Sequence, residues 1–414
     1  MNDNQHIPSG YKSSPLGIIP EDWEVKRIGD FGKVITGNTP PTEDADNYGN
    51  EYKFVSPADI SGSKYIGSTE KHLSEKGFSI SRQMPKGTVL FTCIGSTIGK
   101  CAIANEALTF NQQINAIICD SKHSGEFLYY ELSHRSNRIK QIAGEQAVPI
   151  INKSTFENYK ILCPSFEEQR DIADLLSLWD TAIAKQTALI EQLTLRKRGL
   201  MQQLLTGNKR LKGFEGEWKE VRLGKIGVFF KGGGVPKNKI IDAGNKCLTY
   251  GDLYTKYDFV ISDVKSYIDD DTANESVKIR YGDICFAGSG ETKEEIGKCA
   301  AFIDDDYGYA GGDIIVFRAN DCNPITLSYI LNSGDVIRQK SNMGQGHSVV
   351  HIYPYQLEKL IIKIPSRVEQ DAISTILTES DKEIEIQKQK LSDLQEQKRG
   401  LMQVLLTGKK RIEI

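Results

Sequence analysis

The sequence predicts an α+β protein in which two mixed α/β domains are joined by two long helices, packed as an antiparallel coiled coil with internal pseudo-twofold symmetry. Three observations predict this fold class. The chain contains a tandem repeat, the first part of each copy carries short strand-like runs, and each copy ends in a long helical run with coiled-coil spacing. The domains are predicted to cover residues 1–165 and 213–366, and the helical segments residues 166–212 and 367–414.

Composition already excludes several classes of protein. The chain has 414 residues, 39% of them hydrophobic, which is enough apolar material for two or three cores. Lys+Arg 52 against Asp+Glu 55 gives a net charge of -3, which excludes nucleic-acid binding through a bulk positive field. Because there is neither a long apolar stretch nor an apolar signal region at the start, we expect a cytoplasmic protein without contact to a membrane. The eight cysteines show no spacing typical of metal ligands and are expected to be buried, reduced thiols.

The repeat is clearest at its two ends. Trp23 aligns with Trp218, and the glycines and prolines that follow the two tryptophans align as well. The run KRGLMQQLLTGNKRL that starts at Lys197 returns almost unchanged from Lys398. Between these ends the globular parts share only a skeleton of Gly, Pro and strand positions. A conserved helix end suits two copies of one partner protein, and variable globular surfaces suit two different ligands.

The globular part of each copy mixes strands with one late helix. β-branched and aromatic runs bounded by Gly, Asn and Asp predict strands, for example from Thr88 and from Asp283. Amphipathic helices are expected at about 126–142 and 325–340. Each globular part is therefore predicted to be a mixed α/β domain.

The long helices carry their own start and stop signals. Ser165 and Ser366 are suitable N-caps, and Gly207 and Gly408 are suitable terminators. About 38 residues per helix correspond to roughly 55–60 Å. A hydrophobic seam of that length must be buried, and the helix of the other copy is the nearest candidate partner.

The sequence offers no catalytic or metal site. The run from Gly95 to Cys101 resembles a phosphate-binding loop but has the wrong spacing and lacks the Ser or Thr after its lysine, so it is predicted to be a turn between strands. The acidic runs Asp269–Asp271 and Asp304–Asp306 are predicted to be solvated loops. No segment typical of an amino-methyltransferase and no glycine-rich dinucleotide loop is present.

These features resemble the specificity (S) subunit of a type I restriction–modification enzyme over essentially the whole chain. The resemblance rests on the opening Pro20-Glu-Asp-Trp-Glu-Val, on Pro-x-x-x-Glu-Gln at the start of each helix, and on the repeated Lys-Arg-Gly-Leu-Met-Gln-x-Leu-Leu-Thr-Gly. It implies two target recognition domains that each read one half of a bipartite site in double-stranded DNA, and helices that set the spacer between the half-sites.

The resemblance also implies partners and the absence of chemistry in this chain. Two modification (methyltransferase) subunits would dock on the helices and use S-adenosylmethionine, and ATP-dependent restriction (translocase/endonuclease) subunits would join them. The S subunit itself would hold no cofactor. The expected partner-binding residues are those of the repeated helix ends: Lys197, Arg198, Leu200, Met201, Leu204, Leu205, Lys398, Arg399, Leu401, Met402, Leu405 and Leu406.

Four loops in each domain have side chains suited to bases and phosphates, and they occur at corresponding positions of the two copies. In the first domain the candidate DNA-binding residues are Thr36, Asn38, Thr39, Ser96, Thr97, Lys100, Gln112, Gln113 and Gln146. In the second domain they are Lys231, Gly232, Gly233, Gly234, Ser289, Lys293, Lys298, Gln345, His347 and Ser348. The glycines are expected to let the backbone approach phosphate closely.

Two other functions are compatible with parts of this pattern. A non-catalytic scaffold without DNA specificity would need the same helices, with globular ends that bind proteins. A standalone DNA-modifying enzyme is disfavoured by the missing motifs. The basic ends of the helices either line a DNA channel, dock a partner, or only complement the helix C-termini.

Overall fold

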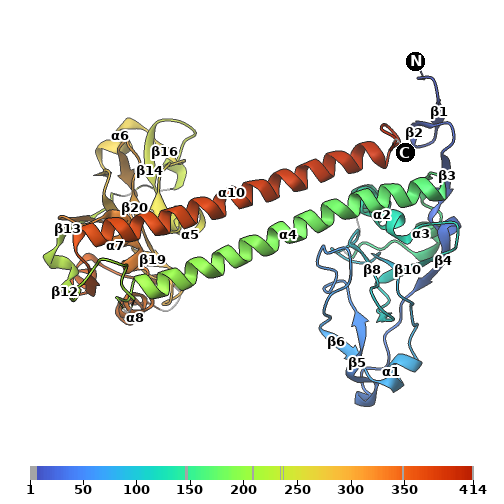
Figure 1. The fold of residues 1–414 in the computed structure, drawn as a ribbon, viewed down its shortest axis with the longest axis horizontal. Helices are drawn as coiled ribbons and strands as arrows, with labels where there is room; N and C mark the ends of the chain where they lie inside the picture. The colour runs from blue at the N-terminus through green and yellow to red at the C-terminus, as the bar shows by residue number, and fades with distance from the viewer. Residues whose placement is uncertain are drawn as a thin grey trace. The chain divides into compact units, whose positions relative to one another are not determined.

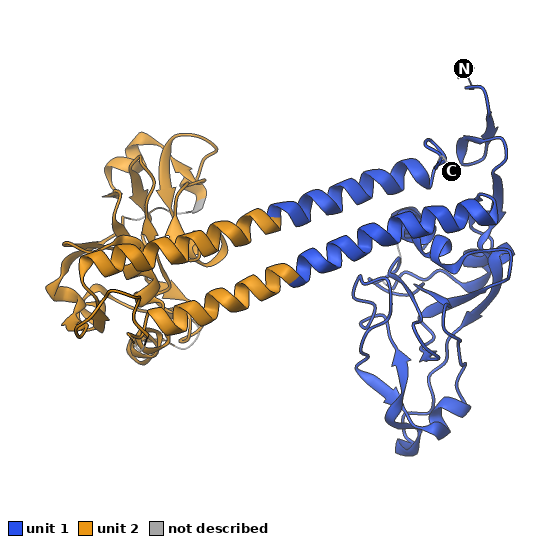
Figure 2. Ribbon diagram, viewed as in Figure 1, with its two compact units in different colours: residues 1–188, 389–414 blue, residues 189–388 orange. Residues whose placement is uncertain are grey.

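The computed structural model describes residues 7–144, 148–207, 209–233, 235, 237–346 and 349–412. The chain divides into two compact units (Figure 2): unit 1 comprises residues 1–188 and 389–414, and unit 2 comprises residues 189–388. The long helices α4 (Phe166–Leu204) and α10 (Arg367–Leu405) are both divided between the two units: one part of each helix belongs to unit 1 and the other part to unit 2. Unit 1 is therefore built from both ends of the chain, whereas unit 2 is continuous.

Unit 1 contains a four-stranded antiparallel sheet with strand order β4-β10-β7-β8, which carries the loops predicted to contact DNA (Figure 1). Its strands are β1 (Tyr11–Ser14), β2 (Gly17–Pro20), β3 (Glu24–Arg27), β4 (Gly32–Thr36), β5 (Tyr48–Val55), β6 (Lys71–Leu73), β7 (Val89–Thr92), β8 (Cys101–Ile103), β9 (Thr109–Phe110), β10 (Ile114–Cys119) and β11 (Lys160–Cys163). Its shorter helices are α1 (Glu75–Ser79), α2 (Gly125–Gln141) and α3 (Lys153–Glu157).

Alternation along the strands of this sheet separates two hydrophobic clusters. Val89 and Phe91 face the cluster that also contains residues of α2, α4 and α10, and Leu90 faces the cluster formed with β5 and β9. The first cluster includes Trp23, which has no exposed surface. The sheet thus has a core on both faces, and its strand ends are held rigidly from both sides.

Unit 2 repeats this plan with a larger sheet of order β13-β22-β18-β20-β15. Its strands are β12 (Lys219–Arg222), β13 (Gly227–Lys231), β14 (Asn245–Leu248), β15 (Val260–Ile261), β16 (Tyr267–Ile268), β17 (Val277–Ile279), β18 (Asp283–Ala287), β19 (Ser289–Gly290), β20 (Cys299–Phe302), β21 (Gly308–Ala310), β22 (Ile314–Ala319), β23 (Val350–His351) and β24 (Ile361–Ile364). Its shorter helices are α5 (Tyr250–Thr255), α6 (Asp270–Asn274), α7 (Pro324–Leu331), α8 (Gly334–Met343) and α9 (Pro354–Leu357).

One predicted helix differs from expectation. The helix expected at 126–142 is α2, but the one expected at 325–340 is broken into α7 and α8. Asn332 is the C-cap of α7: its side-chain amide donates to Ser328 O one turn back (2.9 Å) and to Cys299 O (2.7 Å), and its side-chain oxygen accepts from Cys299 N (3.2 Å). An Asn side chain that bonds to backbone in this way competes with the helix and ends it.

The predicted helix signals are confirmed. Ser165 Oγ accepts from Glu168 N (3.2 Å), and Ser366 Oγ accepts from Glu369 N (3.4 Å), as N-caps do. Gly207 and Gly408 adopt φ of 71° and 68°, the left-handed conformation that ends helices. The fold class is also confirmed, since within each unit a part of α4 pairs with an antiparallel part of α10.

The cysteines and the long helices agree with most of what the sequence predicts. All eight cysteines are free thiols. Six are buried, while Cys119 and Cys322 are half-buried, which corrects the expectation for these two. In the part of the chain that the structure describes, no helix combines the length and the apolar character needed to cross a membrane.

Candidate nucleic-acid interface

The predicted loops of unit 1 meet at one edge of its sheet. β4 ends at Thr36, β10 begins at Ile114, and these strands are antiparallel, so the loops that follow β4 and precede β10 leave the sheet together. Gly37 N donates to Ile114 O (3.1 Å), and Asn38 N donates to Phe110 O (3.1 Å). Two of the four loops are therefore joined by backbone hydrogen bonds.

The other two loops of unit 1 reach the same edge. Cys93 N donates to Gln113 O (2.8 Å), which ties the loop after β7 to the loop before β10. Gly95 N in turn donates to Pro149 O (2.9 Å), which ties it to the segment after residue 147. Gln146 lies outside the described residues, so its position is not assigned.

Side chains on this edge form a small polar network. Thr36 Oγ1 donates to Asn115 Oδ1 (2.7 Å), and Thr39 Oγ1 donates to Gln112 Oε1 (2.7 Å). Asn111 donates to Gln113 Oε1 (3.0 Å). Both glutamines keep an amide nitrogen without a hydrogen-bond partner among the described residues, and Gln112 is exposed. A glutamine held by its oxygen presents its two N–H groups in a defined direction.

The edge of unit 2 is assembled in the same way. Gly232 N donates to Ile314 O (2.8 Å), and Gly233 N donates to Ala310 O (3.2 Å). Gly288 links two further loops, since its N donates to Asp313 O (2.7 Å) and its O accepts from Ile352 N (2.9 Å). Among the predicted residues of this edge, Gly234, His347 and Ser348 lie outside the described part of the chain.

Glycine is required at these edges for a different reason from the one expected. A Cβ on Gly37 would lie 2.1 Å from Asn111 O, one on Gly232 would lie 2.0 Å from Gly311 O, and one on Gly233 would lie 2.4 Å from Glu275 O. Backbone of the same chain therefore requires glycine here, and the expectation of close approach to phosphate is not needed to explain it.

The predicted residues differ in accessibility. The prediction that Ser289 contacts DNA is wrong. Ser289 is 3% exposed, and its hydroxyl bonds to His351 Nδ1 (2.9 Å), so it is held inside the protein. Lys100 and Lys298 are half-buried, with Nζ of Lys100 on Pro57 O (3.0 Å) and Nζ of Lys298 3.7 Å from Asp258. The exposed predicted residues are Thr39, Ser96, Gln112, Lys231, Lys293 and Gln345, and the half-buried ones Thr36, Asn38, Thr97 and Gln113.

Arg82 belongs to the edge of unit 1 although the sequence analysis missed it. Its backbone N donates to Asn38 Oδ1 (2.8 Å), and its exposed guanidinium donates to Thr36 O. No repeat or motif marks this position, because Arg82 lies between α1 and β7 and reaches the edge only through tertiary contacts. It supplies a cation beside the amides, as phosphate contact requires.

The run that resembles a phosphate-binding loop and the two acidic runs have structural roles. The run from Gly95 to Cys101 is a turn between β7 and β8, as predicted. Asp269 caps α6 through Thr272 N (2.8 Å), and Asp304 is 7% exposed and bonds to Lys246 (2.8 Å), so this aspartate is not the solvated loop residue expected. Over the described ranges, no group of His, Cys, Asp and Glu is arranged to hold a metal ion.

Lys340 anchors the loop between β19 and β20 of unit 2 from inside the protein. It is 1% exposed, and its Nζ donates to Gly297 O (2.7 Å) at the end of the loop between β19 and β20. Burial lowers the pKa of this lysine, because the charged form loses its hydration. The loop is held at its other end by Tyr254, whose hydroxyl donates to Ser289 O (3.1 Å).

Lys340→Met is expected to stabilise unit 2 by about 1–2 kcal/mol at neutral pH, because a buried ammonium is replaced by an apolar chain of similar volume. The same change releases Gly297 and should speed amide hydrogen exchange in residues 291–297. Urea unfolding and exchange mass spectrometry measure both effects. Lys140→Met is the matched control, because exposed Lys140 makes only a 3.4 Å contact to Ser96 O. If the Lys340→Met protein were less stable than the parent, burial of the Lys340 ammonium would not be a net cost to the stability of unit 2, and the prediction would be wrong.

The repeated helix ends, expected to bind a partner, are instead docked inside the chain's own units. Leu405 and Leu406, 2% and 0% exposed, join the core of unit 1, and Leu204 and Leu205 join the core of unit 2. Leu200, Met201, Leu401 and Met402 pack partly buried against the same cores. For the four buried leucines this corrects the expectation of a partner-facing surface, and Arg198 and Arg399 remain exposed.

The lysines of the two repeats make the same contacts in both units. In unit 1 Lys398 bonds to Asp180, which also accepts from the Tyr130 hydroxyl, and Lys398 Nζ lies 5.2 Å from the centre of the Tyr130 ring. In unit 2 Lys197 bonds to Asp381, which accepts from Tyr329, with Lys197 Nζ 5.1 Å from the ring centre. The end of each long helix packs in the unit in which the other long helix begins. The two lysines therefore have the same surroundings, which explains why they are identical in both copies.

The Glu-Gln pairs at the helix starts complete the docking. Glu168 pairs with Arg411 (2.8 Å), and Glu369 pairs with Arg210 (2.6 Å). Arg411 also bonds to Asp22 and lowers the pKa of that carboxyl. The side-chain oxygen of each following glutamine accepts from the N-cap residue of an earlier helix of the same unit: Gln169 from Ser124 N of α2 (2.9 Å), and Gln370 from Asn323 N of α7 (2.8 Å). The motif thus joins three elements in each unit.

Comparison with known proteins agrees with this geometry. Residues 20–195 and 215–396 each match the type I restriction modification DNA specificity domain. The specificity subunit of the type I restriction enzyme MjaVIII of Methanocaldococcus jannaschii is 27% identical, covering 95% of this chain and 94% of the relative. That of MjaIX from the same organism is 36% identical over 45% of each chain.

Solved structures share the fold. The S subunit of a type I restriction-modification system from M. genitalium gives a TM-score of 0.59 at 15% identity, covering 100% of this chain and 99% of that one. A chain from a study of complex assembly and conformational transition of the type I system gives 0.60 at 17% identity, covering 95% and 99%. The comparisons give no support to a scaffold without DNA specificity. The chain belongs to the family of type I restriction–modification specificity subunits, which recognise a DNA sequence for their enzyme complex and do not catalyse its reactions.

Proposed function

We propose that each unit reads one half of a bipartite DNA site through its four-loop edge, and that the two edges read different sequences. The observation that carries this proposal is the shared assembly of the two edges from equivalent backbone hydrogen bonds, combined with different exposed side chains. Unit 1 presents Asn38 and Gln112 beside Arg82, and unit 2 presents Lys231 and Lys293 beside glycines. Amides favour adenine in the major groove, and lysine favours guanine or phosphate.

The partners follow from this role. Two methyltransferase subunits that bind S-adenosylmethionine would dock on the helices, and ATP-dependent restriction subunits would join them in the cytoplasm. Since the repeated leucines Leu204, Leu205, Leu405 and Leu406 are already buried, docking must use residues that remain exposed, such as the apolar helix residues Leu178 and Leu195, which are 68% and 63% exposed. Large exposed apolar side chains along a helix favour protein contacts.

Gln112→Ala combined with Gln113→Ala is expected to relax the sequence preference at one half-site, because about 1–3 kcal/mol of discrimination is lost with each bidentate base contact. Selection of bound duplexes from a randomised library, performed with the methyltransferase complex, measures the preference at both half-sites. The other half-site is an internal control and should keep its preference.

The reciprocal variant, Lys231→Ala combined with Lys293→Ala, should change the second half-site and spare the first. Unchanged selectivity at both half-sites in both variants would refute the assignment of the edges. Loss at both half-sites in either variant would show that the edges do not act separately.

A further inference from the structure

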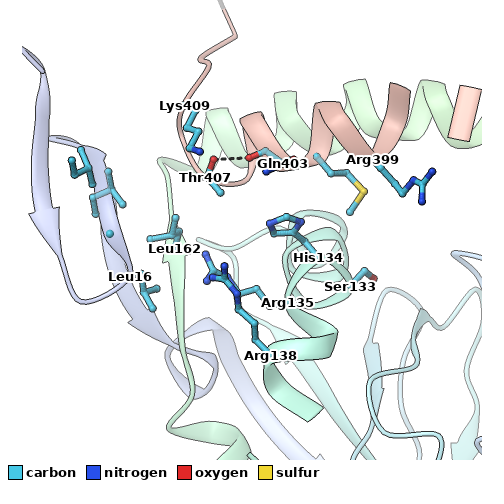
Figure 3. Close-up of a pocket in the computed structure, with 14 residues that line it drawn as sticks. Leu16, Ser133, His134, Arg135, Arg138, Leu162, Arg399, Gln403, Thr407 and Lys409 are labelled. Atoms are coloured by element: carbon cyan, nitrogen blue, oxygen red, sulfur yellow. Dashed lines mark hydrogen bonds between the residues drawn. The ribbon is translucent and has the colours of Figure 1, made fainter. Parts of the chain in front are cut away.

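Unit 1 contains a basic pocket that none of its recognition-loop residues lines. The pocket has a volume of about 670 Å³ and lies between α2, β2 and the end of α10 (Figure 3). We call it the basic pocket. Its lining includes five basic residues and no Asp or Glu: His134, Arg135, Arg138, Arg399 and Lys409. This volume is within the usual range of ligand sites.

Three of these cations have unmatched charge. Arg135 is already paired with buried Glu131. Burial and the two neighbouring arginines lower the pKa of His134, which favours its neutral form. Arg138, Arg399 and Lys409 are exposed, and none has an ion-pair partner in the described part of the chain. An acid-free pocket with three unmatched cations is complementary to an anionic group.

The floor of the basic pocket is apolar. Leu16 from the β1–β2 turn, Leu162 from β11 and Met402 from α10 line it, and Leu162 is buried. Figure 3 shows Leu16 and Leu162 to the left of Arg135 and Arg138, with Lys409, Thr407, Gln403 and Arg399 above them. An occupant that carries an apolar side chain next to its negative charges would therefore complement this pocket.

The corresponding surface of unit 2 has a different charge. A smaller cavity of about 330 Å³ lies there between α8, β24 and the end of α4, and Thr206 lines it as Thr407 lines the basic pocket. The charged residues of its lining are Glu220, Asp335 and Lys363, and Asp335 is paired with Arg338. If DNA followed this face, both copies would be expected to be cationic, because both would meet the same polyanion. One-sided charge favours a partner that binds only one of the two copies.

We propose that the basic pocket receives an acidic segment of another protein subunit of the complex, one segment per chain, with an apolar side chain on the floor and carboxylates on Arg138, Arg399 and Lys409. Lys409 is also one of the few positions where the repeated helix ends differ, since Asn208 stands in the other copy. The chain would thus distinguish its two otherwise similar ends for a protein that must bind once.

Zero-length carbodiimide crosslinking tests the proposal on the complete complex, purified with its partner subunits and bound to duplex DNA. The reagent joins a lysine amine to a carboxylate in direct contact. We expect Lys409 to be joined to an Asp- or Glu-rich segment of a partner subunit, identified by mass spectrometry. Lys363, which lines the cavity of unit 2, is the matched control and should give no such product. Absence of a Lys409 product would overturn the proposal.

A variant separates a protein occupant from DNA. Arg138→Gln with Arg399→Gln should weaken binding of the crosslinked partner about tenfold, or roughly 1.4 kcal/mol, and leave the affinity of the isolated chain for duplex DNA unchanged. If instead DNA affinity falls and its salt dependence becomes shallower, the pocket holds phosphate and the proposal is wrong. Both arginines are exposed, so folding should be retained, and Lys409→Asn, which installs the residue of the other copy, serves as a milder second variant.

Discussion

Leu406→Ala is expected to destabilise unit 1 by about 2–5 kcal/mol, because it leaves a cavity in a closely packed core. Leu406 has no exposed surface and packs in the cluster that contains Trp23 and Phe127, residues from the other end of the chain. Hydrogen exchange should therefore accelerate in β3, β11 and α2, and selectivity at the half-site read by unit 1 should be lost. Exchange mass spectrometry and library selection measure these two results.

Leu205→Ala is the matched control, since it is the same change at the same position of the repeated sequence. Leu205 follows the helix that starts next to the first domain, yet it packs in the core of unit 2. Its substitution should accelerate exchange in β12, β24 and α7 and leave unit 1 protected. If both variants affected the same unit, or each affected the unit that precedes it in the sequence, the assignment of helix ends to units would be wrong.

Arg135→Met is expected to cost about 3–5 kcal/mol near neutral pH, because it removes the cation that forms an ion pair with the fully buried carboxylate of Glu131. Glu131 has no exposed surface. Its Oε1 accepts from Arg135 Nε and from Leu162 N (3.2 Å), while Oε2 has no hydrogen-bond partner in the described structure. Without Arg135 the carboxylate would keep one backbone hydrogen bond and lose its direct ion pair, and only the more distant charge of Arg138 would still act on it.

The cost should depend on pH in a defined direction. Burial raises the pKa of Glu131 above its ordinary value, and loss of Arg135 raises it further. The folded variant then binds a proton more tightly than its unfolded chain, so its deficit relative to the parent shrinks as the pH falls. Urea unfolding at about pH 7.5 and about pH 5.5 measures the change. A His134→Gln background in both proteins removes the titration of the neighbouring histidine.

A second substitution separates the charge from the packing. Glu131→Gln added to Arg135→Met should recover most of the lost stability at neutral pH, because a neutral amide costs less to bury than an unpaired carboxylate. No recovery, together with a deficit that does not change with pH, would show that the apolar contacts of Arg135 dominate its role. The two residues would then have no electrostatic coupling.

The candidate site shows which of its features the local sequence pattern can predict. Corresponding loops were predicted from the alignment of the two copies, and the structure brings these loops to one edge in each unit. Ser289 was predicted to bind DNA but is buried and bonds to His351, because β19 and β23 pair across a sequence separation that no local pattern spans. Arg82 was missed for the same reason, since only tertiary contact places it beside Thr36.

The sequence by itself determined the repeat, the fold class, the ends of the long helices and the family, because these follow from local periodicity, capping chemistry and matching motifs. Only the tertiary structure decided which helix end belongs to which unit. Lys197 and Lys398 read as solvent-facing residues of a partner surface, and both instead pair with an aspartate on the antiparallel helix and lie over a tyrosine ring. Such pairings arise between positions far apart in the chain, so composition and spacing carry no record of them. The same reason explains the charge difference between the two cavities, since the residues that line each cavity come from several elements that are far apart in the sequence.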